Sequence, residues 1–239
     1  MMPDAIRSER AGEVVTVTIA RPDASNRLTN SMIADIVAAL DAAADARVIV
    51  LRGAGADFCL GREIEPPAPG SGVNALDVMR DDAGPVIAMY DALRRRRQTI
   101  VGLVQGRAWG IGLVLAAACD VTLAADDSSF RLRELGRGIP PCIAMAPLLD
   151  RMPVKAIGHL VYSAEEADAT WAQHAGVVSQ IVPAAELEAR GKAAVERLLS
   201  FPDEAVRTVK QFLATAPRFN EVNAALYGAS LLSNVLGSR

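Results

Sequence analysis

Residues 99–120 have the sequence TIVGLVQGRAWGIGLVLAAACD, and this stretch decides the fold. Residues 100–104 are a continuous apolar run, which is typical of a strand covered on both faces. Residues 106–112 form a turn with three glycines, and residues 113–119 are small and apolar on every side, as in a buried helix. The stretch therefore predicts a strand, a tight turn and a helix inside an α/β protein.

The chain on both sides of this stretch agrees with an α/β fold. Residues 14–19 alternate between apolar side chains and threonine, which predicts a half-buried strand. Residues 32–40 carry an apolar stripe at helical spacing, and residues 48–51 are a second continuous apolar run. Strand, helix and strand in this order are the unit of a parallel sheet with a crossover helix. The last 50 or so residues are alanine-rich and predict helices.

Composition excludes several classes of protein. The chain has 239 residues, and its 51% hydrophobic and 22% charged residues are ordinary for a globular protein with one core and an appendage. With 25 basic and 28 acidic residues the net charge is −3, and aromatics are only 4%, so we expect no nucleic-acid partner.

Cysteine and histidine usage and the N-terminal sequence give further expectations. The three cysteines are widely spaced, which argues against a disulfide framework and favours the cytoplasm. Two histidines and the absence of a CxxC pair predict no metal site. The N-terminus has no apolar core of a signal peptide, and Gln105 and Arg107 interrupt the one membrane-like stretch, so we expect no membrane span.

The glycine turn at residues 106–112 has three interpretations. A dinucleotide site is one, but the turn does not follow the first strand. The Tyr-x-x-x-Lys pair of short-chain dehydrogenases is also missing, since the three tyrosines are followed at that spacing by Arg94, Glu166 and Leu231. An oxyanion hole is the second, because a helix that begins after Gly110 directs free backbone N–H groups at a developing negative charge. The third is a tight turn that only packs the helix.

Six motifs then occur in order: RPDASNRL (21–28), VIVLRGAGADFCLGRE (48–63), GRAWGIG (106–112), ACD (118–120), FRLRE (130–134) and GIPP (138–141). Together they resemble the crotonase family, the enoyl-CoA hydratases and isomerases. The resemblance implies a spiral of strand-strand-helix repeats over residues 1–185 and a helical oligomerisation region over residues 186–239. It also implies a homotrimer or a dimer of trimers.

The resemblance implies an acyl-CoA substrate, an enolate-like intermediate and no cofactor beyond the coenzyme A of that substrate. The backbone N–H groups of Arg62 and Ile111 would form the oxyanion hole. The coenzyme A would bind along the segment that contains Ala56, Phe58, Leu60 and Gly61. Trp109, Val114 and Cys142 would line the acyl pocket.

The acid/base residues depart from the hydratase pattern of two glutamates. The first would fall at Val114, which cannot transfer a proton, and the second falls at Glu134. Some relatives have an acid at the position of Cys142, where we expect a packed, unreactive side chain. One carboxylate suits double-bond isomerisation better than water addition. The alternatives are a hydratase or dehydratase with atypical acid/base residues, and an inactive subunit that binds CoA esters.

Charged neighbours of these residues allow further roles. Arg131, Arg133 or Arg137 would hold Glu134 in its charged form or bind a carboxylate of the substrate. The Arg62 side chain is another candidate for that carboxylate. We also considered Glu63 and Glu65 as auxiliary acids, and we expect no catalytic role for either histidine, His159 or His174.

Overall fold

The computed structural model describes residues 5–63 and 72–237. Its main sheet has the strand order β1-β2-β3-β4-β6-β9, in which β1 is antiparallel to β2 and all other neighbours are parallel. A smaller sheet has the order β5-β7-β8. The strands are β1 (Ile6–Ala11), β2 (Val14–Ile19), β3 (Val48–Gly53), β4 (Thr99–Val104), β5 (Arg107–Trp109), β6 (Val121–Ala125), β7 (Ser129–Arg131), β8 (Ala167–Asp168) and β9 (Gln180–Val182).

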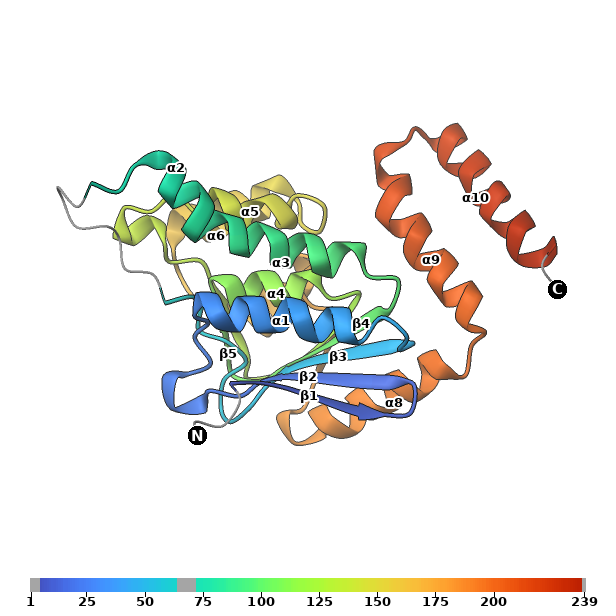
Figure 1. The fold of residues 1–239 in the computed structure, drawn as a ribbon, viewed down its shortest axis with the longest axis horizontal. Coiled ribbons are helices and arrows are strands. Elements are labelled where there is room, and N and C mark those ends of the chain that lie inside the picture. Colours follow the sequence, from blue (N-terminus) through green and yellow to red (C-terminus); the bar gives the residue numbers. More distant parts are fainter. Residues whose placement is uncertain (1–4, 64–71, 238–239) are drawn as a thin grey trace.

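Helices cover both faces of the main sheet. Helices α1, α3 and α4 lie on one side and α8 lies on the other (Figure 1). A π-helical turn, Val78–Ala83, joins α2 to α3, and a 3-10 turn, Leu135–Arg137, follows Glu134. The α-helices are α1 (Asn30–Ala42), α2 (Ala75–Asp77), α3 (Gly84–Arg95), α4 (Ile111–Ala118), α5 (Cys142–Leu148), α6 (Val154–Ser163), α7 (Ala169–His174), α8 (Leu187–Leu199), α9 (Asp203–Thr215) and α10 (Glu221–Gly237).

The central strands are buried on both faces, as the continuous apolar runs predict. In β3, Ile49 and Leu51 join the hydrophobic cluster that also contains residues of α1, α3 and α4. Val48 and Val50 point the other way, into the cluster with α8. Alternate side chains of one strand therefore hold two layers of helices on the sheet.

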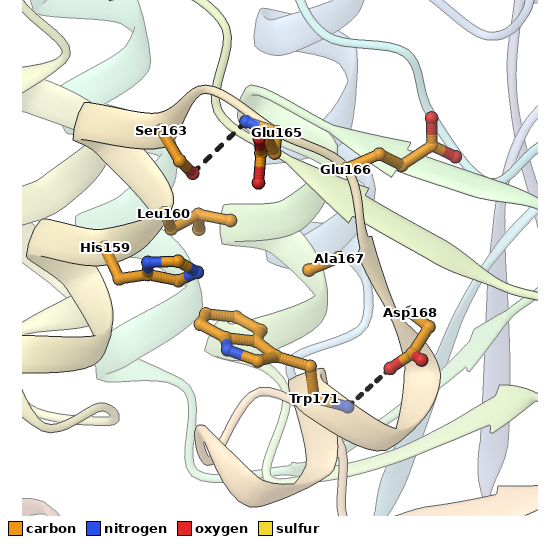
Figure 2. A pocket seen from close by; sticks show the side chains of 8 residues that line it. All are labelled: His159, Leu160, Ser163, Glu165, Glu166, Ala167, Asp168 and Trp171. Carbon is orange, nitrogen blue, oxygen red and sulfur yellow. Dashed lines mark hydrogen bonds between the residues drawn. The ribbon is translucent and has the colours of Figure 1, made fainter.

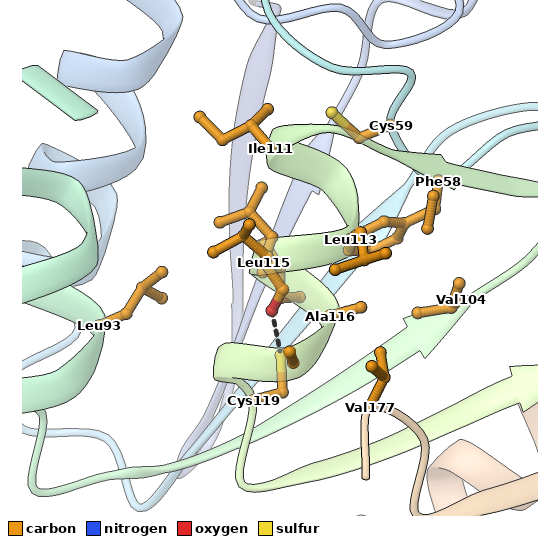
Figure 3. Close-up of a cluster of buried hydrophobic side chains, with 14 of the residues drawn as sticks. Phe58, Cys59, Leu93, Val104, Ile111, Leu113, Leu115, Ala116, Cys119 and Val177 are labelled. Carbon is orange, nitrogen blue, oxygen red and sulfur yellow. Dashed lines mark hydrogen bonds between the residues drawn. The ribbon is translucent and has the colours of Figure 1, made fainter. Parts of the chain in front are cut away.

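Helix α4 lies in the middle of the larger cluster (Figure 3). All of its residues from Ile111 to Ala117 are buried, because its small apolar side chains let it pack on every side. The predicted strand and helix of residues 99–120 are thus confirmed as β4 and α4, although the helix begins two residues earlier than predicted. The short strand β5 within the glycine turn was not predicted.

The C-terminal region is helical, as predicted. Helix α8 packs on the main sheet through Leu187 and Val195. Helices α9 and α10 extend away from the sheet (Figure 1), and α9 has no buried residue. The boundary of the core at residue 185 stays a prediction. Within residues 5–63 and 72–237, no helix combines the length and the apolar character that a membrane span requires.

Candidate active site

Two segments distant in sequence meet beside the N-terminus of α4. The Cys59 N–H donates to the Arg107 carbonyl at 3.1 Å, and the Trp109 N–H donates to the Cys59 carbonyl at 2.9 Å. This pairing places the chain after β3 against β5. A Cβ added to Gly110 would lie 3.4 Å from the Gly61 Cα, so the two glycine turns are in contact.

Both turns need glycine for their backbone conformation. Gly61 has a φ of 102° and Gly110 has a φ of 55°, in the region that side chains disfavour. At Gly112, a Cβ would lie 2.1 Å from the Cys59 carbonyl oxygen. Glycine at these positions lets helix α4 begin directly against the segment that follows β3.

Two backbone N–H groups at this contact have no acceptor among the described residues. The Leu28 N–H donates to the Gly61 carbonyl and the Leu28 carbonyl accepts from the Glu63 N–H, each at 2.9 Å. Because Arg62 lies between Gly61 and Glu63, its own N–H points away from Leu28. Ile111 is the first residue of α4, and the helix itself provides no acceptor for its N–H. Two such donors at a helix N-terminus can bind an oxyanion.

Glu134 brings a carboxylate to the same place. Its Oε1 lies 2.8 Å from the position that a Cβ on Gly110 would take. Its Oε2 is buried and has no hydrogen-bond partner within the described part of the chain. Because buried carboxylate oxygens in folded proteins are nearly always paired, an unpaired one beside two free donors indicates a site for a ligand.

Among the described residues no arginine forms an ion pair with Glu134 within 4 Å, although the charges of Arg133 and Glu134 interact over a longer distance. The guanidinium groups of Arg107, Arg131 and Arg133 gather around the Trp109 ring, at 5.4, 5.5 and 5.6 Å from its centroid. Burial lowers the pKa of Arg133, and the charges of surrounding arginines, Arg27 first, lower it further. The cluster therefore has an excess of positive charge.

The remaining predicted pocket residues differ in burial. Val114 is fully buried in α4, while the indole of Trp109 donates to the Ser129 hydroxyl at 3.3 Å. Cys142 is exposed at the start of α5, so the expectation of a packed thiol is wrong. That these three residues line an acyl pocket stays a prediction.

Polar side chains fix the segment for which coenzyme A binding is predicted. Asp57 is buried and accepts the Arg107 Nε at 2.8 Å and Nη2 at 2.7 Å. These hydrogen bonds lower the pKa of the Asp57 carboxyl. Asn26 donates to the carbonyls of Ala54 and Asp57 at 2.8 and 2.7 Å. Sequence analysis missed these two polar residues, whose only signal is their place inside the matched motifs.

The side chains along this segment point in different directions. Ala56 is exposed, and Gly61 lies at the contact with Gly110. Phe58 and Leu60 are buried in the protein. A ligand along the segment would therefore meet backbone at the two buried positions.

Arg62 and Glu63 are occupied by other partners. The Arg62 guanidinium bonds to Asn30 Oδ1 at 2.6 Å and to Asp82 at 3.0 Å, and its side chain is only 9% exposed. These bonds anchor the segment that carries the free N–H of Arg62. The guanidinium is therefore not available to a carboxylate of the substrate, and the hypothesis that it binds one is wrong. Glu63 forms an ion pair with Arg21 at 2.7 Å on the surface. Glu65 lies outside the described residues.

His159 lies in a different pocket. Figure 2 shows it beside Trp171, and their ring centroids are 6.1 Å apart. The same pocket is lined by Ser163, Glu165 and Asp168 and contains none of the residues of the Glu134 site. His174 ends helix α7. That neither histidine acts in catalysis stays a prediction.

Comparisons with known proteins support the predicted family. The family model for enoyl-CoA hydratase/isomerase matches residues 9–236. A probable enoyl-CoA hydratase of Rhodobacter capsulatus is 30% identical over 86% of this chain and 79% of that protein. The 2,3-dehydroadipyl-CoA hydratase of Escherichia coli is 31% identical over 73% of this chain and 68% of that enzyme.

Solved structures show the same fold. Pseudomonas aeruginosa AtuE superposes with a TM-score of 0.88 at 26% identity and covers 98% of this chain and 92% of its own. A putative enoyl-CoA hydratase of Thermobifida fusca, solved in complex with CoA, has a TM-score of 0.88 at 24% identity, over 98% of this chain and 93% of its own. The chain therefore belongs to the enoyl-CoA hydratase/isomerase family, with the crotonase fold.

Proposed function

We propose that the protein binds enoyl-CoA thioesters and moves their double bond by a proton transfer through Glu134. One observation carries this proposal: Glu134, whose buried Oε2 is unpaired among the described residues, brings its carboxylate against Gly110, where the two glycine turns with the free N–H groups of Arg62 and Ile111 meet. An enolate mechanism needs a base at the α-carbon and donors at the thioester oxygen. CoA complexes of a structural neighbour support the substrate class.

The proposed reaction balances without any other reactant. Glu134 takes a proton from C2 of a 3-enoyl-CoA, and the electrons of the broken C–H bond move onto the thioester oxygen. The N–H groups of Arg62 and Ile111 hold this oxygen, each donor contributing about 3 kcal/mol to the transition state. Glu134 then returns the proton to C4, which gives the 2-enoyl-CoA. We propose no cofactor beyond the coenzyme A of the substrate.

The presence of Val114 favours double-bond migration over the addition of water. A hydratase of the two-glutamate pattern needs a second group to hold and activate water, and the buried valine cannot do so. Hydration or dehydration is the second candidate, and the names of the relatives favour it. An inactive subunit that only binds CoA esters is the third.

The exposed C-terminal helices support a homo-oligomer, either a trimer or a dimer of trimers. Val209 and Leu213 of α9 are 58% and 62% exposed, and Leu226 of α10 is 65% exposed. Apolar side chains along two adjacent helices gain stability when a second copy covers them.

Mass spectrometry of thioesters in heavy water tests the proposed reaction. The full-length protein is incubated with 3-enoyl-, 2-enoyl- and 3-hydroxyacyl-CoA of matched chain length. We expect 3-enoyl-CoA to become 2-enoyl-CoA. The product should gain no mass other than that of incorporated deuterium, and in particular no water. A product that has gained or lost water would instead establish a hydratase. Binding of all three thioesters without any conversion would establish the inactive subunit.

A further inference from the structure

Helix α3 brings a tyrosine toward the same site. Helix α3 leads into β4 and α4 follows it, so the two helices run parallel to each other across one face of the sheet (Figure 1). Figure 3 shows the Leu93 side chain of α3 pointing toward α4. Tyr90 is three residues earlier, on the same face of the helix and one turn closer to the N-terminal end of α4. Ile111 and Gly110 lie at that end.

The charges around the Tyr90 phenol belong to the candidate active site. Burial raises the pKa of Tyr90, and the negative charge of Glu134 raises it further. The thiol of Cys59 acts in the same direction, and Arg62 opposes it. Cys59 and Arg62 belong to the segment that meets the glycine turn, so the phenol of α3 lies within electrostatic reach of this contact. A phenol in these surroundings stays neutral and can donate a hydrogen bond.

Within residues 5–63 and 72–237, neither the Tyr90 hydroxyl nor the Oε2 of Glu134 has a hydrogen-bond partner. The Tyr90 hydroxyl makes no hydrogen bond to the described residues, although the ring packs against the hydrophobic core. The Oε2 of Glu134 also lacks a partner within these residues. A neutral donor and a carboxylate oxygen are complementary, and leaving the buried Oε2 of Glu134 unpaired costs free energy.

We propose that Tyr90 is a positioning residue for Glu134, and that its hydroxyl donates a hydrogen bond to the carboxylate through one bridging water. Tyr90 thereby supplies, from helix α3, the second polar group that Val114 cannot supply from helix α4. This inference rests on the proposed role of Glu134 as the proton carrier. The hydrogen bond favours the charged carboxylate, which is the form that removes a proton, and fixes its direction in the site.

A pH profile tests the proposal in the full-length protein. Tyr90→Phe removes only the hydroxyl oxygen, and Tyr162→Phe is the matched control because Tyr162 is 82% exposed. We expect Tyr90→Phe to lower kcat about tenfold, as for loss of one charge-assisted hydrogen bond. We also expect the acidic limb of kcat against pH to move upward by about one unit, with KM changed less than twofold. A profile of Tyr90→Phe that matches Tyr162→Phe would overturn the proposal.

A second measurement does not depend on turnover. The chain has three tyrosines, so protein labelled with 13C at tyrosine Cζ gives three signals that the Tyr→Phe variants assign. We expect the Tyr90 signal of the wild type to change with pH, and this change to disappear in Glu134→Gln. We expect Tyr162 and Tyr227 to show no such change. A Tyr90 signal that is the same in the wild type and in Glu134→Gln would contradict the contact.

The two measurements separate this inference from the proposed function. Turnover that Glu134→Gln abolishes and Tyr90→Phe leaves unchanged would keep the function and remove Tyr90. A protein that converts no thioester, yet has a Tyr90 signal that differs between the wild type and Glu134→Gln, would remove the function and keep the interaction of Tyr90 with Glu134.

Discussion

Replacing Gly110 by alanine tests the glycine turn and the carboxylate together. The new Cβ would lie 2.8 Å from Glu134 Oε1, which is closer than real Cβ contacts allow. Oε1 is the end of a flexible side chain, so the carboxylate can move away at little cost in stability. The catalytic rate of Gly110→Ala should fall instead, because a displacement of a catalytic group by about 1 Å lowers the rate up to about 100-fold.

The backbone of Gly110 sets the stability cost of the same substitution. Its φ of 55° is unfavourable for alanine, and such strain costs about 1–3 kcal/mol. For a chain of this size, about 2 kcal/mol corresponds to a fall in Tm of about 4–8 °C. Gly110→Ala should therefore remain folded at 25 °C while its kcat falls about 10- to 100-fold.

Gly136→Ala is the matched control. Beyond its chain neighbours, no atom of the described residues lies within 4 Å of a Cβ at Gly136, although the residue is only two positions from Glu134. The assay is the rate of conversion of 3-enoyl- to 2-enoyl-CoA, with thermal unfolding followed in parallel. If Gly110→Ala keeps the rate of Gly136→Ala, the placement of the carboxylate against the turn is wrong.

Three further predictions concern the support of the site and the C-terminal helices. Asp57→Asn should destabilise the protein by about 1–2 kcal/mol at pH 7, because it removes the charged partner of Arg107. Arg107 holds the folded pKa of Asp57 below its ordinary value of 3.8, so this stabilisation is present above that value and is lost as the pH falls through the folded pKa. Urea unfolding from pH 7 to pH 3 should accordingly show a steeper fall in the free energy of unfolding for the wild type than for Asp57→Asn. An equal dependence on pH in the two proteins would count against the Asp57–Arg107 ion pair. Asp82→Asn weakens the anchor of Arg62 and should lower kcat more than it raises KM, whereas Asp81→Asn, one position away with its own partner Arg80, should change neither. Leu213→Asp, at a position 62% exposed, should lower the mass measured by light scattering while leaving far-UV circular dichroism intact, and an unchanged mass would exclude α9 from the interface.

The central layers could be predicted from the sequence because their signals are local. The apolar run in β4 and the small side chains of α4 each lie within one continuous segment. Strand β1 was missed because its sequence, IRSERA, is mostly polar and exposed at the sheet edge, with no apolar alternation to detect. Strand β5 was missed because it exists only through pairing with Cys59 and β7, far away in sequence.

The candidate site was predictable only in part. Glu134, Arg62 and Ile111 came from matching motifs, and the structure brings the two backbone donors and the carboxylate to one place. The anchoring of Arg62 by Asn30 and Asp82 joins residues up to 32 positions apart and leaves no local pattern. The same is true of Tyr90, whose role depends on the packing of α3 beside α4.

The rate of double-bond migration in Glu134→Gln tests the central claim most directly. The substitution keeps the size of the side chain and removes its ability to carry a proton, and Glu165→Gln, at an exposed position in the other pocket, is the control. With 3-enoyl-CoA as substrate, we predict a rate at least about 1,000-fold below the wild type for Glu134→Gln and a normal rate for Glu165→Gln. Unchanged affinity of Glu134→Gln for the thioester would show that the pocket is intact. Conversion by Glu134→Gln at the wild-type rate would contradict the assignment of Glu134 as the proton carrier.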